Sequence, residues 1–271
     1  MGWRDRIGPI RFDNTVDFNA RVRIVRRVDH LGGVARQGRQ MSRRGLAGLY
    51  ERRIFPWIND SVAYKPEFEA LRREALAPAR GRVVEIGFGS GASLGCYPPA
   101  VTSVTGVEPN DGMLARARPR VAVAGARATL VQAAAEHLPL SDASADTVVS
   151  VLTLCSVSDT AAVLAEIRRI LRPDGQLLVA EHGLADDPSV ARWQHRLNPL
   201  QKLLACGCHL DRPVVAIIAS AGFRFEAVRS FHVPGTPRTH GWLTVGQAVK
   251  TPVDDIMEGQ TRPGPEGPGG H

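Results

Sequence analysis

Several features typical of membrane, secreted and nucleic-acid-binding proteins are missing from this sequence. It contains no run of about 18 apolar residues, so we expect no membrane-spanning helix. Its first residues include no apolar segment followed by small residues, so we expect no secretion and a cytoplasmic location. Four cysteines in 271 residues are too few for a disulfide framework, which predicts reduced thiols. Aromatic residues make up only 6% and are not interleaved with basic ones, so we expect no nucleic-acid partner.

The excess positive charge lies in one segment of the chain. The net charge is +7, and residues 1–50 hold 11 arginines and 4 aspartates without any lysine or glutamate. This segment alone accounts for the excess. We predict a basic helical N-terminal extension over 1–50, which either stays in solvent or makes peripheral contact with an anionic membrane. Nothing in the composition indicates an oligomeric state.

Strand and helix patterns alternate through the middle of the chain. Two helical patterns flank the region, at 46–78 with a break near Pro56 and at 213–221, and a third covers 159–171 with Asp159 as its N-cap. The alternation predicts an α/β, Rossmann-like, doubly wound and mostly parallel seven-stranded sheet within a domain at 51–250, followed by a disordered Pro/Gly-rich tail at 251–271. The expected strands are 82–87, 101–107, 127–132, 146–154, 176–181, 223–230 and 241–249.

A glycine-rich loop follows the first of these strands, with the sequence EIGFGSG at 85–91. Its three alternating glycines permit a tight turn and let a ligand approach the backbone closely. We expect the loop to open a helix near Ala92 at the carboxyl edge of the sheet, where cofactors bind in α/β folds. Glu108 ends the second strand, about 20 residues after the loop, where an acid accepts hydrogen bonds from ribose hydroxyls.

Two cofactors are compatible with this loop. Its spacing satisfies the loose G-x-G-x-x-A pattern of nicotinamide dinucleotide sites. Glu85, however, precedes the first glycine by two residues, and its charge there would repel a pyrophosphate. The same carboxylate is well placed to accept hydrogen bonds from the ammonium group of S-adenosylmethionine (SAM). The residues therefore favour SAM, with a nicotinamide cofactor as the alternative.

Five elements at matching spacing resemble the SAM-binding core of class I methyltransferases. They are Glu85-x-Gly87-x-Gly89-x-Gly91, Glu108-Pro109, Glu136-x-Leu138-Pro139, and the stretches SDASADTV at 141–148 and LRPDG at 171–175. The resemblance implies the class I methyltransferase fold and SAM as cofactor. Many members carry an aspartate where this chain has Ala134, so adenine contacts fall to the backbone near Ala135 and Glu136. We place the cofactor contacts at Glu85, Gly87, Gly89, Gly91, Glu108, Pro109, Asn110, Ala135, Glu136 and Thr153.

Methyl transfer from SAM depends mainly on alignment, and a base is needed only when the acceptor arrives protonated. His182 ends the fifth strand and is the first candidate base, and His209 is the second.

Cys155 is expected to be a buried packing residue. The Cys-x-Cys-His spacing at 206–209 does not match structural zinc sites, so we expect no metal. No Asn/Asp-Pro-Pro-Tyr motif follows the fourth strand, which disfavours nucleobase amines as acceptors.

A narrower resemblance covers roughly residues 50–250 and involves the methyltransferase-like alkyl thiol S-methyltransferases and their bacterial relatives. It implies methylation of a small, often hydrophobic thiol. We expect the segment 183–212 to form the wall of the acceptor pocket. Lipid, quinone, phenol or other natural-product acceptors remain alternatives, with transfer to O, N or C, and so does a non-catalytic SAM-binding protein. The resemblance rests on YPP at 97–99, TLCSV at 153–157, EH at 181–182, WQ at 193–194, GCHL at 207–210 and GQAVK at 246–250.

Overall fold

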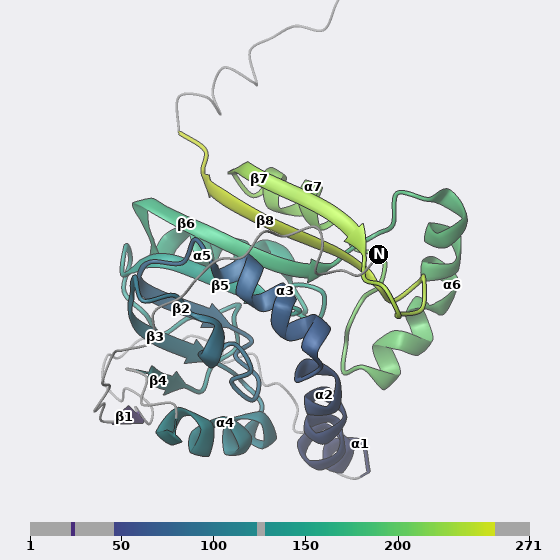
Figure 1. Ribbon diagram of the computed structural model, residues 1–271, viewed down its shortest axis with the longest axis horizontal. Helices are drawn as coiled ribbons and strands as arrows, with labels where there is room; N and C mark the ends of the chain where they lie inside the picture. The colour runs from purple at the N-terminus through teal and green to yellow at the C-terminus, as the bar shows by residue number, and fades with distance from the viewer. Residues whose placement is uncertain (1–22, 25–45, 124–127, 253–271) are drawn as a thin grey trace, which may run out of the picture.

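A computed structural model describes residues 23–24, 46–123 and 128–252 of the chain. Its centre is one twisted sheet in the order β1-β4-β3-β2-β5-β6-β8-β7 (Figure 1). All neighbouring strands are parallel except β8, which runs antiparallel to β6 and β7. The strands are β1 (Arg23–Ile24), β2 (Gly81–Ile86), β3 (Val101–Val107), β4 (Ala128–Val131), β5 (Ala145–Val151), β6 (Leu171–His182), β7 (Phe223–His232) and β8 (Trp242–Lys250).

The predicted doubly wound, mostly parallel sheet is confirmed, and its seven longer strands occur where the sequence places them. The two-residue β1 adds an edge strand beside β4, within a segment predicted to be helical. The rest of that predicted extension before Leu46 lies outside the described residues, as does the predicted tail from residue 253. The order of strands reverses between β2 and β5, and cofactors of open α/β sheets bind at the carboxyl ends of strands at such a switch point.

Helices cover both faces of the sheet because its strands alternate between two apolar cores. In β2, Val83 packs into the core under α3 and α4, whereas the adjacent Val84 packs into the core under α5 and α7. In Figure 1, α3 lies on the near face of the sheet and α5 and α7 on the far face. The helical segments are α1 (Leu46–Leu49), the π-helical η2 (Tyr50–Ile54), α2 (Phe55–Ala63), α3 (Pro66–Leu76), the 3-10 turn η3 (Leu94–Cys96), α4 (Asp111–Val123), α5 (Thr160–Ile170), α6 (Pro188–Leu204) and α7 (Val214–Ser220).

Two local expectations are wrong. The helical region does not break at Pro56; it continues through that residue and breaks at Tyr64 and Lys65, before α3 begins at Pro66. Pro56 is the second residue of α2, directly after the π-helical η2, so the residue that lacks a backbone N–H coincides with the change of helix type. The glycine loop does not open a helix near Ala92 either. Only the short η3 follows, because Pro98 and Pro99 come immediately after Tyr97 and stop helical growth. The N-cap prediction at Asp159 is confirmed, since its side chain accepts the Ala162 N–H at 3.0 Å.

Candidate active site

The glycine loop between β2 and η3 adopts a backbone that requires glycine. Gly87, Gly89 and Gly91 have φ values of 62°, 58° and 85°, in the left-handed region that side chains disfavour. A Cβ atom on Gly87 would collide with the Thr153 side chain, so the loop passes directly against the end of β5. Beside Gly89 the only atom within 4 Å of such a Cβ is the Gly87 carbonyl oxygen, at 3.8 Å. The loop is therefore packed on one side and open at its tip.

Glu108 stands directly after β3 and holds the tip of this loop. Its Oε2 accepts the Gly89 N–H at 2.9 Å, and its Oε1 accepts the Asn110 N–H at 2.8 Å. The side chain is buried, and burial raises its pKa while the two backbone bonds oppose that change. A carboxylate offers about four lone-pair sites, so each oxygen keeps room for one further donor.

Glu85 is a second buried carboxyl, on β2 directly before the loop. Its oxygens accept the Ser93 hydroxyl at 2.6 Å and the Tyr97 hydroxyl at 2.7 Å. Burial raises its pKa to about 7, against the lowering effect of these two bonds and of the nearby Arg72. The side chain is therefore held in place and sits close to its protonation midpoint at neutral pH.

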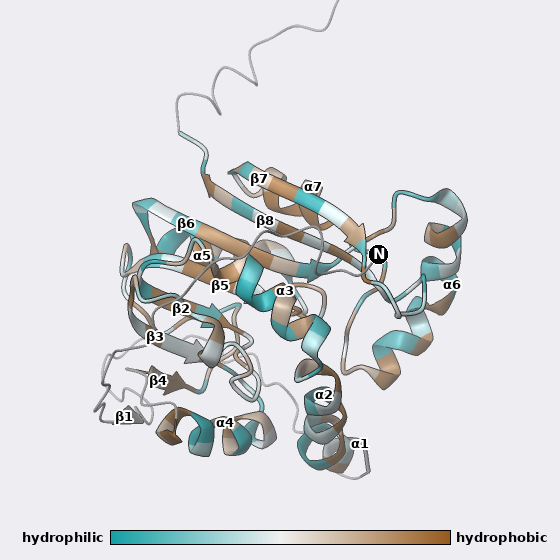
Figure 2. Ribbon diagram, viewed as in Figure 1, coloured by the Kyte–Doolittle hydropathy of each residue, from teal (hydrophilic) through white to brown (hydrophobic). Residues whose placement is uncertain are grey.

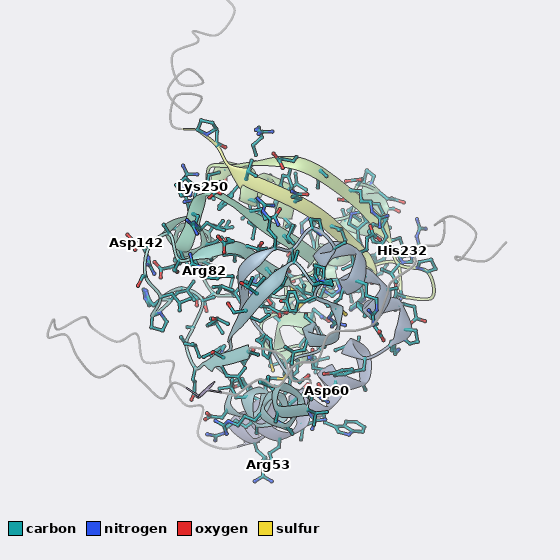
Figure 3. All side chains as sticks on the ribbon, turned by 60° about the vertical axis from the view of Figure 1, so that its left-hand side comes forward. Arg53, Asp60, Arg82, Asp142, His232 and Lys250 are labelled. Atoms are coloured by element: carbon teal, nitrogen blue, oxygen red, sulfur yellow. The ribbon has the colours of Figure 1, made fainter. Side chains whose placement is uncertain are left out.

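Sequence reasoning missed Asp60, which ties α2 to the glycine loop and to α4 (Figure 3). Its carboxylate accepts the Ser90 hydroxyl and the side chains of Arg116 at 2.6 Å and Arg120 at 2.9 Å. Burial would raise the pKa of Asp60, but these bonds together lower it below its ordinary value. Arg120 also stacks on the Tyr64 ring, 4.4 Å from its centroid. No local motif marks Asp60, because its partners lie 30 to 60 residues away in the chain.

The other predicted cofactor residues lie around the same edge of the sheet. Pro109 is exposed beside Glu108, and Ala135 is buried. Asn110 caps α4 by accepting the Gly112 N–H at 2.8 Å, and its amide donates to the Glu51 carbonyl at 3.0 Å. Glu136 accepts the Ser158 N–H at 3.1 Å. Asn110 and Glu136 thus have structural partners that sequence reasoning did not anticipate.

Glu181, next to the predicted base, braces the loop that follows β5. Its Oε1 accepts the Ser150 hydroxyl at 2.6 Å and the backbone N–H groups of Thr153 and Leu154 at 2.8 and 2.9 Å. Its Oε2 accepts the Cys155 N–H at 3.3 Å. Burial raises the pKa of Glu181, and these four donors oppose that rise. The brace fixes the backbone of residues 153–155 beside the glycine loop.

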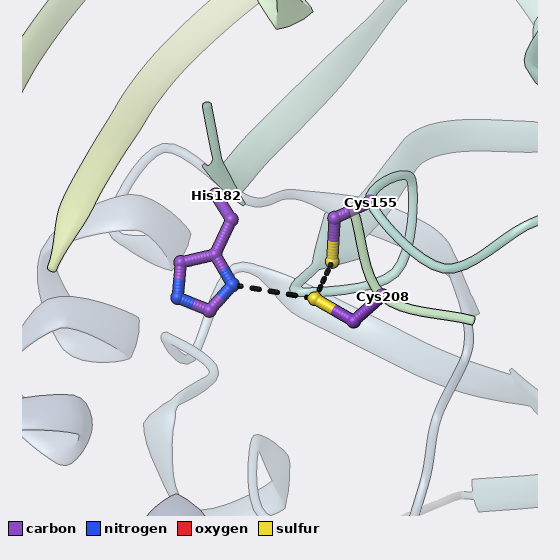
Figure 4. Close-up of side chains that lie close together, drawn as sticks. All are labelled: Cys155, His182 and Cys208. Atoms are coloured by element: carbon purple, nitrogen blue, oxygen red, sulfur yellow. Dashed lines mark hydrogen bonds between the residues drawn. The ribbon is translucent and has the colours of Figure 1, made fainter. Parts of the chain in front are cut away.

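Beyond this brace, three side chains from separate segments form what we call the Cys–His cluster: Cys155, His182 and Cys208 (Figure 4). The Cys208 sulfur lies 3.5 Å from the Cys155 sulfur and 3.8 Å from Nδ1 of His182. The hydrogen bond with Cys155 lowers the pKa of Cys208, with a further contribution from His182, and raises that of Cys155. Sequence reasoning singled out His182 but treated Cys155 as packing.

His209, the second predicted base, lies next to the cluster but has different partners. Its Nδ1 is 3.4 Å from the Asn198 amide and 3.8 Å from the Asp211 carboxylate. Its backbone N–H donates to the Cys155 carbonyl at 2.8 Å. Burial lowers the pKa of His209, and the neighbouring Arg212 and Lys202 lower it further. These contacts hold the loop that carries Cys208 against the end of β5.

Within the segment 183–212, which was predicted to form the wall of the acceptor pocket, four large apolar side chains of α6 point to solvent. Trp193, Leu200, Leu203 and Leu204 of α6 are 55–70% exposed instead of lining an enclosed pocket. Trp57 on α2 is likewise 64% exposed, and Figure 2 shows apolar stretches on both helices. The Tyr50 hydroxyl of η2, which leads directly into α2, donates to the carbonyl of Leu204, the last residue of α6, at 2.5 Å.

The residues around the glycine loop fit SAM. A nucleoside with an amino-acid tail needs an open glycine tip, a carboxylate for its ammonium group and a second carboxylate for its ribose hydroxyls. The loop tip is open at Gly89, and two buried carboxyls, Glu85 and Glu108, stand on neighbouring strands beside it. Both carboxyls keep unused acceptor sites.

Comparison with known proteins agrees with this geometry. Residues 84–179 match the family model described as "Methyltransferase domain". The chain is 33% identical over 210 residues to thiol S-methyltransferase TMT1B of Rattus norvegicus, which covers 72% of this chain and 83% of that protein. It is 32% identical over 192 residues to phosphatidylethanolamine N-methyltransferase of Cereibacter sphaeroides, which covers 69% of this chain and 90% of the relative.

Solved structures share the same architecture. One is a SAM-dependent methyltransferase of Thermotoga maritima, described as a possible histamine N-methyltransferase. It superposes with a TM-score of 0.56 at 22% identity, over 76% of this chain and all of that one. Similarity at this level of identity shows a common fold and leaves the acceptor to be argued from the site itself.

Proposed function

The chain belongs to the class I SAM-dependent methyltransferases, and from this premise we propose that it methylates the sulfur of a small, apolar thiol. The observation that carries this proposal is the Cys–His cluster at the carboxyl ends of β5 and β6. Cys155 lies two residues after Thr153, whose side chain touches the glycine loop, so the cluster adjoins the cofactor site. The similarity to thiol S-methyltransferases over most of their length supports the same acceptor class.

In this proposal the chain's own residues bind and orient the two reactants. Glu108 accepts the ribose hydroxyls, Glu85 accepts the ammonium group, and the glycine tip admits the cofactor to the backbone. When bound, SAM supplies a methyl group already activated by its sulfonium. The protein then has to hold the acceptor sulfur in line and as a thiolate, which is the reactive form. We assign deprotonation of the acceptor to the Cys–His cluster, of which His182 is part, and we assign to His209 the positioning of the loop that carries Cys208.

An acceptor screen tests this proposal. The purified protein is incubated with SAM and matched pairs of small acceptors that differ only in carrying SH, OH or NH₂ on the same apolar skeleton. Methylated products are measured by mass spectrometry. We expect turnover of thiols and none of the matched alcohols, phenols and amines. Faster methylation of an oxygen or nitrogen acceptor would overturn the thiol assignment while leaving the family unchanged.

A lipid-directed methyltransferase is a second candidate, favoured by one specific observation. The exposed apolar side chains of α2 and α6 form surfaces whose burial against lipid would be favourable. One relative is named phosphatidylethanolamine N-methyltransferase. Among the described residues no helix combines the length and apolarity needed to cross a bilayer. Surface docking would therefore depend on these helices, with the arginine-rich segment before residue 46 attracted to anionic lipid.

Co-sedimentation with anionic vesicles tests this candidate. Binding that weakens with salt and falls when Trp57 and Leu203 are both changed to Ser would support it. Vesicle binding insensitive to both changes, or methylation of free thiols without any transfer to phosphatidylethanolamine in the vesicles, would remove it.

A further inference from the structure

The spacing of the Cys–His cluster matches a tetrahedral metal site. Zinc binds thiolate sulfur at about 2.3 Å and imidazole nitrogen at about 2.0 Å, so in a tetrahedral site two sulfurs lie about 3.8 Å apart and a sulfur and a nitrogen about 3.5 Å apart, each within about 0.3 Å of the separation seen here. The observed separations from the Cys208 sulfur are 3.5 Å to the Cys155 sulfur and 3.8 Å to Nδ1 of His182. All three donor atoms lie within 4.8 Å of one another. The Cys155 sulfur and the His182 ring would have to approach each other by at most about 1.3 Å to surround one ion.

Each of the three donors is held by a separate part of the fold. The Cys155 backbone is fixed by Glu181 on its N–H and by the His209 N–H on its carbonyl. His182 is the last residue of β6, paired with Leu243 of β8. Cys208 follows Cys206 and Gly207, whose φ values of 48° and 95° form the turn that directs it inward. Such preorganisation by an outer layer of hydrogen bonds is typical of metal sites.

We propose that the Cys–His cluster binds a zinc ion through both cysteine sulfurs and Nδ1 of His182, and that the acceptor thiolate takes the fourth position. Three protein ligands of the Cys₂His type with an open fourth site are characteristic of catalytic zinc, whereas structural zinc has four. No fourth Cys, His, Asp or Glu joins the cluster among residues 46–123 and 128–252. This inference rests on the proposed function, since it names the device that presents the thiol sulfur.

The proposed methyl transfer needs no reactant other than SAM and the acceptor thiol. The acceptor thiol releases its proton to solvent when its sulfur binds zinc, because a coordinated thiol is deprotonated. The acceptor sulfur then forms a bond to the methyl carbon as the bond from that carbon to the sulfonium breaks. The electron pair of the broken bond stays on the departing sulfur, which gives S-adenosylhomocysteine. The neutral thioether binds zinc more weakly than the thiolate does and leaves.

The sequence offered no sign of this site, because its ligands lie 26 and 53 residues apart along the chain. Only the fold brings the end of β5, the end of β6 and the loop after α6 together. The local Cys-x-Cys-His spacing is misleading, since Cys206 and His209 both lie outside the cluster.

Cobalt binding tests the proposal with a readout that does not depend on activity. The full-length protein is kept reduced with a phosphine, stripped of metal and titrated with Co²⁺, whose visible spectrum distinguishes tetrahedral thiolate sites. We expect one Co²⁺ per chain, displaced by Zn²⁺. Cys155→Ser and Cys208→Ser should each weaken binding by more than the roughly 10–100-fold caused by loss of an outer-shell partner. Cys206→Ser, two residues from Cys208, is the matched control and should bind as the wild type does.

Binding of S-adenosylhomocysteine verifies that each variant is folded. A wild-type protein that binds this product but gives no tetrahedral cobalt spectrum would overturn the metal site. Unchanged cobalt affinity in both serine variants would do the same.

A second arm separates this inference from the proposed function. Addition of a small thiol to the cobalt-loaded protein should add a third thiolate and shift the spectrum, whereas the matched alcohol should not. Thiol methylation by protein free of metal, at the undiminished rate, would refute the zinc site and leave thiol methylation standing. If no thiol changes the cobalt spectrum and the protein methylates only other acceptors, then both the thiol acceptor and its position at the metal are refuted.

Discussion

At the scale of single residues, Glu85 links cofactor binding to pH. Its pKa in the folded protein, about 7, lies above the ordinary value of 4.5 because of burial. A raised folded pKa contributes stability that is full below pH 4.5 and lost as pH rises through 7. The carboxylate form is the one that attracts an ammonium group. Alkaline conditions should therefore weaken the empty fold slightly and favour the bound cofactor.

Glu85→Gln should separate these two effects. The glutamine side chain cannot ionise, whereas Glu85 of the wild type loses its proton as pH rises. The thermal midpoint of the variant minus that of the wild type should therefore be higher at pH 8 than at pH 5. Its affinity for S-adenosylhomocysteine at pH 8 should fall at least tenfold, because the ammonium loses its charged acceptor. Thermal unfolding at both pH values and calorimetric titration provide the two readouts. A wild-type advantage in stability that grows with pH would contradict the burial argument.

Gly87→Ala tests whether the loop backbone is as constrained as its geometry indicates. A non-glycine residue in the left-handed region costs roughly 1–2 kcal/mol, and here the added Cβ also meets Thr153. We expect lower stability by at least this amount and a marked loss of affinity for S-adenosylhomocysteine. Gly95→Ala is the matched control, since nothing lies within 4 Å of its added Cβ. Equal effects of the two substitutions in chemical denaturation would contradict the assignment.

His182→Ala should slow methylation of a thiol in a pH-dependent way. Loss of the group that holds the acceptor deprotonated should lower the rate about 10²-fold at pH 7. A cysteine-like thiol has a pKa of about 8.5 and ionises unaided above it, so the defect should shrink at higher pH. Single-turnover rates from pH 6.5 to 9.5 provide the measurement. A defect that stays constant across this range would show that His182 acts in another way, as a purely structural residue would.

Motifs identify residues whose role depends on their immediate neighbours in the chain. Glu85, the loop glycines and Glu108 could be selected from sequence because a strand, a turn and a chemically required group follow one another there. Asp60, Cys155 and Cys208 could not, since their environment is made by segments that only the fold brings together. Glu181 was adjacent to a predicted base, but its four hydrogen bonds to the end of β5 depend on strand pairing.

At the scale of elements, α2 acts on the cofactor site through Asp60, whose carboxylate accepts the Ser90 hydroxyl of the glycine loop. Asp60→Asn removes a charge that Arg116 and Arg120 share. We expect a loss of about 1.5 kcal/mol, near the low end for hydrogen bonds to a charged group, since both arginines are about one-third exposed. Affinity for S-adenosylhomocysteine should fall as well, because Ser90 lies within the loop.

Glu69→Gln serves as the control, because it breaks an exposed pair with Arg73 on α3 and should cost well under 1 kcal/mol. Urea unfolding of both variants provides the comparison. A larger loss in Glu69→Gln than in Asp60→Asn would contradict the role of Asp60.

The central strands β2, β5 and β6 were the most predictable, because burial on both faces gives them stretches rich in Val, Ile and Leu. Helical detail was less predictable. Pro56 looks like a break, yet the helix accommodates it at the change from the π-helical η2 to α2. Ala92 looks like a helix start, yet Pro98 and Pro99 leave room only for one 3-10 turn.

At the scale of the whole molecule, one edge of the sheet carries all the proposed chemistry. The switch between β2 and β5 places the glycine loop, the two carboxyls and the Cys–His cluster along adjacent strand ends. The exposed apolar helices α2 and α6 flank this edge. A family resemblance predicted the fold and the cofactor and implied a thiol acceptor, but it left other acceptors open, because acceptor recognition depends on how α6 and the loop after it pack.

Calorimetric titration with S-adenosylhomocysteine, performed on the wild type and on Glu108→Ala, tests the cofactor site on which the whole account depends. Glu108→Gln is a control because its amide oxygen can still accept a hydrogen bond from the Gly89 or Asn110 N–H. Thermal unfolding shows whether either variant loses the folded structure. We predict micromolar binding at one site per chain, at least a tenfold loss in both Glu108 variants, and unfolding curves that remain cooperative. Absence of binding to the folded wild type, or full affinity in both variants, would contradict the assignment of this edge as the SAM site.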